Sequence, residues 1–397
     1  MPSYTYLIVG GGMTSDAAVH GIRERDRSGS IGVIATEPHP PYNRPPLSKG
    51  LWKDKPLESI WRKSDGLGVT LHLGRRALGV DPRKKEVTDD QGTVHTFDKL
   101  LLATGATPRR LPFGADQIIY YRTLDDYRRL RDLSERRRRF AVIGGGFIGS
   151  EIAAALTMNG REVVLIFPDE GIGSRMFPRD LALFLSEFYR KKGVEVLSGA
   201  SVTAMEGPED RPTLKVRAAQ TGKEQGVAVE AVVAGIGVQP NVELAQAAGL
   251  KVENGVRVDA GLRSSHPDIY AAGDVASFHN PALDQWLRVE HEDNANTMGD
   301  MAGRSMAGQT VSYDYLPFFY SDLFELGYEA VGEVDSRLET VADWKERYRE
   351  GVVYYLRGGR VRGVLLWNVW EQVDAARRLI TEPGPFSAAN LKGRLPA

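Results

Sequence analysis

Two glycine-rich turns, each directly after a short apolar run, constrain the fold of this chain most. Tyr6–Val9 runs into Gly10-Gly11-Gly12, and Phe140–Ile143 runs into Gly144-Gly145-Gly146. A strand that turns sharply into a helix brings backbone amides and the helix N-terminus against a pyrophosphate, and glycine permits the close approach. Two such motifs predict that the chain binds two dinucleotides, and FAD with NAD(P)H is the economical pair.

Composition limits the class of protein. The chain has 397 residues, enough for two or three domains, and its hydrophobic (42%) and charged (26%) shares are those of a soluble protein. A net charge of −1 favours neither nucleic acid nor an anionic membrane as partner. We find no apolar run that could span a bilayer, no signal-peptide pattern and no metal-ligand spacing, so we expect a cytoplasmic enzyme without a metal.

The chain has no cysteine. It therefore cannot pass electrons through a redox disulfide beside the flavin, and it cannot ligate an iron–sulfur cluster through thiolates. Electrons must leave the flavin directly, to a molecule that visits it.

The order of strand, turn and helix patterns predicts an α/β fold with two Rossmann-like domains and a C-terminal α+β domain. We expect an FAD domain over 1–118 and 246–315, an NAD(P)H domain over 119–245, and the third domain over 316–397. Alternating runs around Arg357-Gly358-Gly359-Arg360 predict a β-hairpin in an antiparallel sheet, with a closing helix over 372–380.

An acidic residue about 20 positions after each glycine-rich turn is expected to hold a ribose hydroxyl. Glu37 has this spacing after the first turn, in which Ser15 replaces the third glycine. Asp169 has it after the second. Asp169 favours NADH by repelling a 2′-phosphate, whereas the nearby Arg175 could accept one, so NADPH stays open.

The segment Pro41-Tyr42-Asn43-Arg44-Pro45-Pro46-Leu47-Ser48-Lys49 resembles the FAD-proximal signature of the apoptosis-inducing-factor-like flavoproteins and their relatives, the oxygenase-coupled ferredoxin reductases. The resemblance continues through most of the chain, in stretches such as 102–108, 143–151, 235–241 and 271–274. The C-terminal stretches 318–322, 327–332 and 366–368 are more similar to apoptosis-inducing factor.

The resemblance implies that Lys49 lies at the reactive N5 edge of the flavin and pairs with Glu151, both catalytic, and that Asp274 holds the ribityl chain of FAD. Phe147 and Trp367 match positions beside the cofactors. The residues expected to contact FAD are Gly10, Gly12, Ser15, Glu37, Arg44, Lys49, Ala103, Thr104, Gly105, Asp274, Glu290, His291 and Trp367. Those expected to contact NAD(P)H are Gly144, Gly146, Phe147, Gly149, Glu151, Asp169, Arg175 and Gly237.

The resemblance further implies hydride transfer from NADH to flavin N5, followed by single-electron transfer to a ferredoxin or rubredoxin. Two alternative functions stay open. One is an oxidase or quinone reductase with a small-molecule acceptor. The other is a redox-responsive NADH-binding module with slow turnover, in which bound NADH would alter dimerisation. A homodimer is therefore compatible with the sequence. The run Arg136-Arg137-Arg138-Arg139 predicts either a docking patch for an acidic carrier or, as we favour, a solvated helix end.

Overall fold

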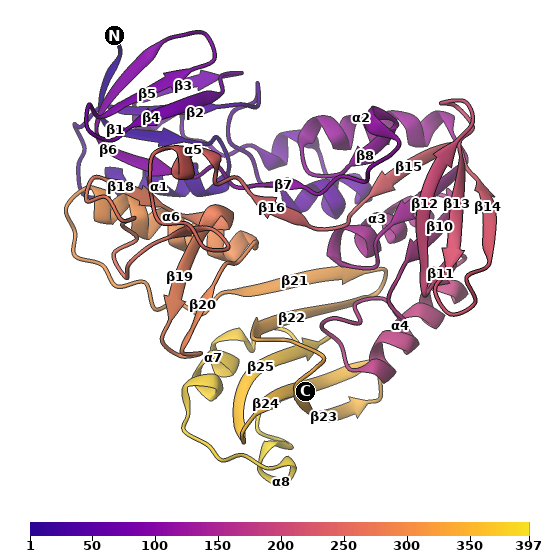
Figure 1. The fold of residues 1–397 in the computed structure, drawn as a ribbon. Helices are drawn as coiled ribbons and strands as arrows, with labels where there is room; N and C mark the ends of the chain where they lie inside the picture. The colour runs from indigo at the N-terminus through magenta and orange to yellow at the C-terminus, as the bar shows by residue number, and fades with distance from the viewer. Residues whose placement is uncertain (397) are drawn as a thin grey trace. The chain divides into compact units, whose positions relative to one another are not determined.

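The computed structural model describes residues 1–396, drawn as a ribbon in Figure 1. Contacts between residues divide the chain into two units. Unit 1 consists of Met1–Arg44, Leu57–Thr107 and Gln239–Phe319. Unit 2 consists of Pro45–Pro56, Pro108–Val238 and the chain from Tyr320 onward. The expected α/β class, with two dinucleotide-binding motifs and a C-terminal α+β part, is confirmed.

A seven-stranded sheet forms the centre of unit 1, in the order β3-β2-β1-β6-β5-β4, with β18 also paired to β6. The parallel strands are β1 (Ser3–Val9), β2 (Ile31–Ala35), β3 (Val69–Leu73), β6 (Val94–Leu102) and β18 (Ile269–Ala271). The antiparallel strands are β4 (Ala77–Asp81) and β5 (Glu86–Asp89). Because β18 lies beside β6, a segment from late in the chain completes the sheet that begins at Ser3.

Helices α1 (Met13–Arg23) and α6 (Glu292–Met306) pack backbone to backbone in unit 1. A Cβ built on Gly303 would collide with the carbonyl of Ala18, so glycine is what allows this approach. The core between these helices and the sheet includes Leu7 and Ile22, both fully buried. This packing fixes the N-terminus of α1 against the end of β1.

Unit 2 contains a five-stranded parallel sheet in the order β11-β10-β9-β15-β8. Its strands are β8 (Ile118–Tyr120), β9 (Arg139–Ile143), β10 (Glu162–Phe167), β11 (Glu195–Ser198) and β15 (Ala231–Ala234). The helices of this part are α2 (Leu124–Arg136), α3 (Phe147–Met158) and α4 (Arg179–Lys191). Strands β12 (Ala200–Glu206), β13 (Thr213–Ala218) and β14 (Glu224–Ala228) form a separate antiparallel sheet.

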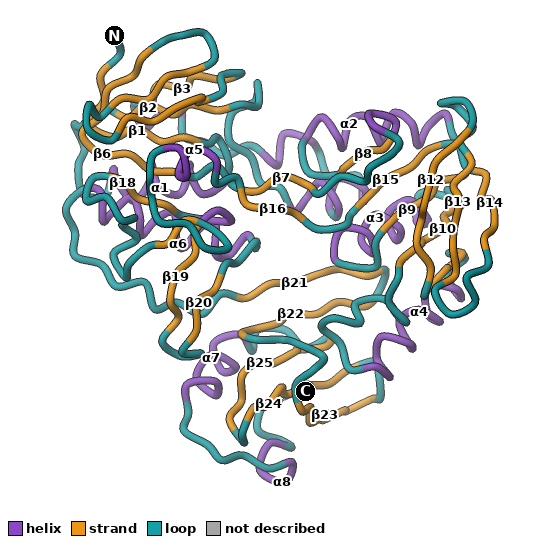
Figure 2. Tube along the Cα trace, viewed as in Figure 1, coloured by secondary structure: helices purple, strands orange, loops and turns teal. Residues whose placement is uncertain are grey.

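The C-terminal part is an antiparallel sheet in the order β21-β22-β25-β24-β23, drawn in orange in Figure 2. Its strands are β21 (Phe318–Leu323), β22 (Leu326–Gly332), β23 (Glu339–Glu346), β24 (Glu350–Arg357) and β25 (Arg360–Trp367). The predicted hairpin between β24 and β25 is confirmed, with Arg357 opposite Arg360. The closing helix is α7 (Val373–Thr381), one residue displaced from the expected range.

Short elements complete the chain. They are β7 (Ala106–Pro108), β16 (Val238–Pro240), β17 (Val256–Arg257), β19 (Ala276–Asn280), β20 (Gln285–Leu287), α5 (Glu243–Ala247), α8 (Ala388–Leu391), and 3₁₀ turns at Pro45–Ser48, Gly50–Lys53, Leu57–Ile60, Asp65–Leu67, Ala115–Gln117 and Gly273–Val275. Within residues 1–396, every helix is too short or too polar to cross a bilayer.

Candidate functional site

The first glycine-rich turn connects β1 to α1. Gly10 has a φ of +122°, and a Cβ there would collide with the carbonyl of Ala103, which follows β6. Gly12 is the N-cap of α1, and no described atom lies within 4 Å of where its Cβ would stand. A helix N-terminus with open space in front of its amides fits a pyrophosphate, so the residues present suit FAD.

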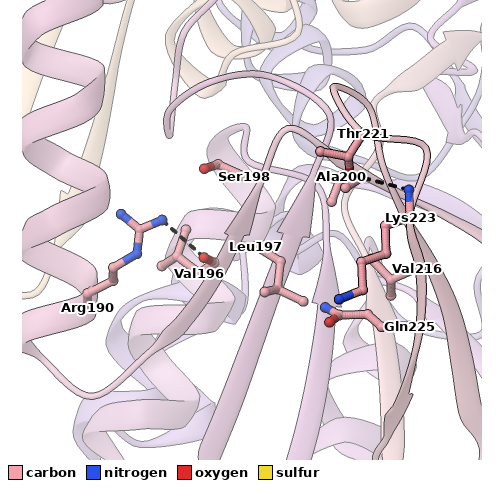
Figure 3. Close-up of a pocket in the computed structure, with 10 residues that line it drawn as sticks. Arg190, Val196, Leu197, Ser198, Ala200, Val216, Thr221, Lys223 and Gln225 are labelled. Atoms are coloured by element: carbon pink, nitrogen blue, oxygen red, sulfur yellow. Dashed lines mark hydrogen bonds between the residues drawn. The ribbon is translucent and has the colours of Figure 1, made fainter.

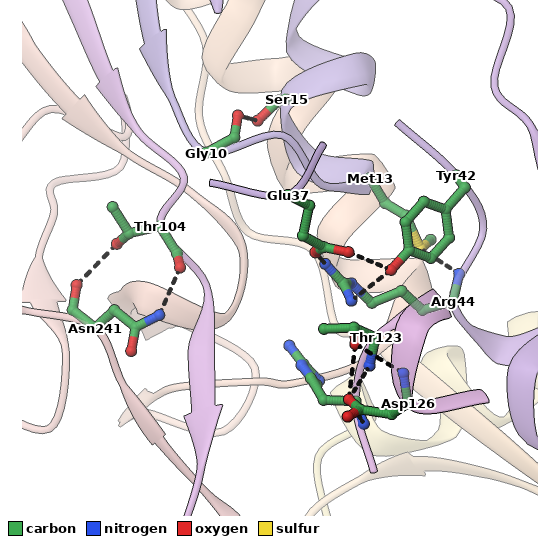
Figure 4. A network of polar contacts seen from close by, with 11 residues as sticks. Gly10, Met13, Ser15, Glu37, Tyr42, Arg44, Thr104, Thr123, Asp126 and Asn241 are labelled. Atoms are coloured by element: carbon green, nitrogen blue, oxygen red, sulfur yellow. Dashed lines mark hydrogen bonds and ion pairs between the residues drawn. The ribbon is translucent and has the colours of Figure 1, made fainter. Parts of the chain in front are cut away.

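Ser15, in place of the third glycine of the motif, is buried in the first turn of α1. Its hydroxyl donates to the carbonyl of Gly10, as Figure 4 shows. The serine therefore secures the turn from inside the protein. The hydroxyl of Thr104, next to Ala103, donates to the backbone carbonyl of Asn241. The backbone carbonyl of Thr104 accepts from the side-chain amide of Asn241.

Glu37 lies two residues beyond β2 and belongs to a polar cluster with Tyr42 and Arg44 (Figure 4). The Tyr42 hydroxyl donates to Glu37 Oε2 at 2.6 Å, and Arg44 Nη2 lies 2.5 Å from Oε1. Arg44 also donates to the Tyr42 hydroxyl at 3.1 Å. Both charged side chains are about one-quarter exposed. The structure thus brings together two of the expected FAD contacts and adds Tyr42, which the sequence analysis did not select.

Asp274, Glu290 and His291 lie in the segment of unit 1 that follows β18. Arg288 connects the first two, because Nη1 donates to the Asp274 carbonyl at 3.2 Å and Nη2 lies 2.6 Å from Glu290 Oε1. His291 is the N-cap of α6, and its ring stacks on Phe319 with centroids 4.3 Å apart.

The second glycine-rich turn repeats the geometry of the first in unit 2. Gly144 has a φ of +115°, and its Cβ would collide with the carbonyl of Gly235 after β15. Gly146 is the N-cap of α3, with no described atom within 4 Å of its Cβ position. At Gly149 a Cβ would collide with the carbonyl of Gly144. This turn therefore fits a second dinucleotide on the same physical grounds.

Asp169 and Arg175 follow β10. Arg175 Nε lies 3.9 Å from Asp169 Oδ2, and the arginine is 85% exposed, so the pair is loose. Glu170 pairs instead with Arg179, at 2.6 Å. Phe167 is buried under the turn, and a Cβ on Gly145 would lie 2.7 Å from its ring. Gly237 has a φ of +90°, and its carbonyl accepts from the Arg109 amide.

A buried ion pair joins Lys49 to Glu151 within unit 2. Lys49 Nζ lies 2.7 Å from Glu151 Oε1, and the two side chains are 13% and 2% exposed. Ser48 donates to Glu151 Oε2 at 2.5 Å, and Ser321 donates to Oε1 at 2.6 Å. The pairing implied by the resemblance is present. Neither serine was selected from the sequence, and Ser321, 170 residues from Glu151, gave no local signal.

Trp367 packs inside unit 2. Its side chain is fully buried, its ring lies parallel to Tyr328 at 5.9 Å, and its Nε1 donates to the Tyr348 carbonyl. Phe177 packs edge-on against it. Trp367 thus belongs to the packing of the C-terminal sheet, and its contact with FAD stays a prediction. Phe147, the first residue of α3, is 6.5 Å from Tyr328 between ring centroids.

The arginine run after α2 is occupied by local partners: Arg136 by Asp132, Arg137 by the Asp210 carbonyl, Arg138 by Glu162, and Arg139 by Glu195. This supports the solvated helix end over a docking patch. A separate pocket, lined by Arg190, Ser198, Thr221, Lys223 and Gln225 among others, shares no residue with the predicted cofactor contacts (Figure 3).

Comparison with known proteins agrees with these motifs. The family model described as pyridine nucleotide-disulphide oxidoreductase matches residues 4–299, and that of the C-terminal domain of apoptosis-inducing factor matches residues 302–347 and 342–382.

Two curated relatives and one solved structure extend the agreement over most of the chain. The mitochondrial apoptosis-inducing factor 1 of Dictyostelium discoideum is 32% identical over 95% of this chain and 78% of its own. The ferredoxin–NAD(+) reductase component of the anthranilate 1,2-dioxygenase system of Burkholderia cepacia is 34% identical over 96% of this chain and 95% of its own. The covalent putidaredoxin reductase–putidaredoxin complex matches with a TM-score of 0.89 and 28% identity over 98% and 95% of the two chains. The resemblance read from the sequence is confirmed.

Proposed function

Because the chain belongs to the pyridine nucleotide-disulphide oxidoreductase family, we propose that it passes electrons from NADH through FAD to a ferredoxin or rubredoxin. It is an FAD-dependent NAD(P)H oxidoreductase. When bound, FAD accepts a hydride from the nicotinamide at N5, which supplies two electrons that can leave singly. The two glycine-rich turns provide one binding site for FAD and one for the nicotinamide nucleotide, as these steps require.

The absence of cysteine is the observation that carries the choice of acceptor. Family members with a redox disulfide pass electrons through it, and this chain has none to use. A carrier that approaches the flavin is the direct alternative. Both the Burkholderia relative and putidaredoxin reductase are named for a reaction with such a carrier, which supports the proposal.

The choice of NADH follows from Asp169. Its carboxylate can accept hydrogen bonds from the adenine ribose hydroxyls and repels a 2′-phosphate. Arg175 Nε lies 3.9 Å from Asp169 Oδ2 and the arginine is 85% exposed, so this loose pair leaves the Asp169 carboxylate available to the ribose hydroxyls. Because the same arginine is also available to a 2′-phosphate, NADPH stays the alternative nucleotide.

Lys49 and Glu151 are the residues to which we assign the catalytic step. A buried carboxylate holds an ammonium group in one place, and we propose that the ammonium acts at the N5 edge of the flavin. The remaining predicted contacts, Trp367 included, are proposed to bind the cofactors as the sequence analysis assigns them.

The proposal is tested by mixing the purified holoenzyme with NADH anaerobically in a stopped-flow instrument, then adding a ferredoxin, a rubredoxin or air. Fast bleaching of the flavin, followed by rapid reoxidation by a carrier protein, is expected. Slow bleaching, a stable long-wavelength band and no response to either carrier would overturn it.

A second candidate function has one observation in its favour. The model of the C-terminal domain of apoptosis-inducing factor matches residues 302–347 and 342–382. An oxidase or quinone reductase, or a slow NADH-binding module, would fit that likeness. Rapid reoxidation by air or a quinone, with indifference to carrier proteins, distinguishes the oxidase or quinone reductase, and a reduced flavin that persists in air distinguishes the binding module. A homodimer and a cytoplasmic location also stay predictions, to be measured by light scattering and by fractionation.

A further inference from the structure

Two separate segments of unit 2 bring polar groups to the carboxylate of Glu151. Lys49 Nζ and the Ser321 hydroxyl reach Oε1, at 2.7 and 2.6 Å, while the Ser48 hydroxyl reaches Oε2 at 2.5 Å. Glu151 is on α3, Ser48 and Lys49 are at the 3₁₀ turn Pro45–Ser48, and Ser321 is on β21.

We propose that Ser48 and Ser321 are positioning residues, which fix the Glu151 carboxylate so that it holds the Lys49 ammonium for flavin reduction. This inference rests on the proposed function of the Lys49–Glu151 pair. It adds two residues to the Lys49–Glu151 pair: Ser48, next to Lys49 in the chain, and Ser321, from the C-terminal sheet.

The need for the serines follows from burial. A carboxylate removed from water is costly unless its oxygens are hydrogen-bonded as well as paired with a cation. Lys49 contacts Oε1, so Oε2 would be left without a donor if Ser48 were absent. Two hydroxyls on opposite oxygens also restrict rotation of the carboxylate, which one ammonium on a flexible chain cannot do.

Glu151 acts electrostatically on three buried tyrosines. Burial, and then the charge on Glu151, raises the pKa of both Tyr189 and Tyr328 well above the usual value. Burial likewise raises the pKa of Tyr121, to which Glu151 contributes less. These phenols therefore stay neutral, and the Glu151 side chain is only 2% exposed to water. In such surroundings each hydroxyl donor has a larger effect on the charge than it has in water.

Both serines lie in segments that are fixed by burial and hydrogen bonds. The carbonyl of Leu47, next to Ser48, accepts from Trp52 Nε1 at 2.8 Å and from the Tyr121 hydroxyl at 2.5 Å. Ser321 is fully buried within β21 and also hydrogen-bonds to Tyr328. Since neither hydroxyl is on a free loop, both can impose a position on Glu151.

The test measures the limiting rate of flavin reduction by NADH, anaerobically, together with the KM for NADH, in the holoenzyme and in Ser48→Ala and Ser321→Ala. Without one of its hydrogen bonds the buried carboxylate no longer holds the Lys49 ammonium in one position, so the limiting rate should fall by about tenfold. The KM for NADH should stay within about twofold, because neither serine lies in the second glycine-rich turn.

Ser186→Ala is the matched control. Ser186 is equally buried in unit 2, but its hydroxyl donates to the Ala182 carbonyl. Its limiting rate and its KM for NADH should equal those of the wild type, and Ser48→Thr, which keeps a hydroxyl, should retain most of the wild-type rate. If Ser321→Ala loses FAD, Ser321→Cys, which nearly keeps the size and weakens the donor, replaces it.

The inference is overturned if both serine variants reduce the flavin as fast as the wild type does. It is also overturned if Ser186→Ala lowers the limiting rate as far as they do, because the effect would then be structural. Failure of the proposed function looks different: NADH would not reduce the flavin of the wild type, or Glu151→Gln would reduce as fast as the wild type.

Discussion

Glu37 and Asp169 occupy the same position in two copies of one motif. The amide of Gly10 donates to the carbonyl of Ile34, three residues before Glu37, and the amide of Gly144 donates to that of Ile166, three residues before Asp169. Each acidic residue then accepts, through its own backbone carbonyl, from a glycine amide after the next parallel strand, Gly74 and Gly199 respectively. This equivalence supports the proposal that Asp169 is the acidic residue of the second motif.

Asp169→Asn is therefore expected to lower the NADH-to-NADPH ratio of kcat/KM by about tenfold. The change removes both a charged hydrogen-bond acceptor, worth ~1.5 kcal/mol, and the repulsion of a 2′-phosphate. Steady-state kinetics with both nucleotides measure it. Glu170→Gln is the control, because Glu170 pairs with Arg179. An unchanged ratio in Asp169→Asn would assign the ribose contact elsewhere.

Lys49→Ala is expected to slow flavin reduction by NADH by about tenfold or more, since a buried Glu151 would lose its cation. The FAD content should stay close to that of the wild type. Lys53→Ala serves as the control, because Lys53 is 45% exposed and lies 3.6 Å from Asp322. Stopped-flow absorbance gives the rate and the visible spectrum gives the FAD content. Equal reduction rates in the wild type and Lys49→Ala would remove Lys49 from the mechanism.

Gly146→Ala and Gly149→Ala should separate cofactor binding from folding. A methyl group at Gly146 meets open space, so the Tm should hardly change while the methyl occupies the place of a phosphate and raises the KM for NADH by about tenfold. A methyl group at Gly149 collides with the Gly144 carbonyl and should destabilise the protein by about 1–3 kcal/mol. Thermal unfolding together with NADH titration distinguishes them. Equal losses of Tm in the two variants would contradict this reading.

Asp268 should make unit 1 sensitive to acid. Its hydrogen bonds to Lys85 and Lys99 lower its pKa from 3.8 to about 2. Because the pKa of Asp268 is lower in the folded than in the unfolded protein, its ionised carboxylate stabilises the fold at pH values above about 4. This contribution to the free energy of unfolding is lost as the pH falls from about 4 to about 2. Asp268→Asn should lower the free energy of unfolding by about 1–2 kcal/mol near neutral pH, after allowance for solvent screening. It should also make the free energy of unfolding less dependent on pH between about 4 and about 2.

Urea unfolding at several pH values checks this prediction. Asp284→Asn is a suitable control, since the Asp284 side chain is 91% exposed. A variant at Asp268 that keeps the steep acid loss of the wild type would show that another carboxylate is responsible.

The sequence by itself determined the parts of the protein that depend on local backbone geometry. Gly10 and Gly144 have positive φ values and lie against a neighbouring carbonyl. Only glycine fits such a position, so the residue type itself indicates the turn. The hairpin between Arg357 and Arg360 was predicted because two glycines in a turn between alternating runs leave few other structures. The Lys49–Glu151 pair came from family resemblance, because 102 residues separate its members and no spacing rule joins them.

Only the tertiary structure decided which side chains from distant segments meet. An aromatic residue at the end of a strand can face a cofactor or the core, and packing against Phe177 and Tyr328 placed Trp367 in the core. Ser321 reaches Glu151 only because the C-terminal sheet packs within unit 2. Contacts of this kind depend on how buried surfaces fit together, and a linear pattern of residues does not record that fit.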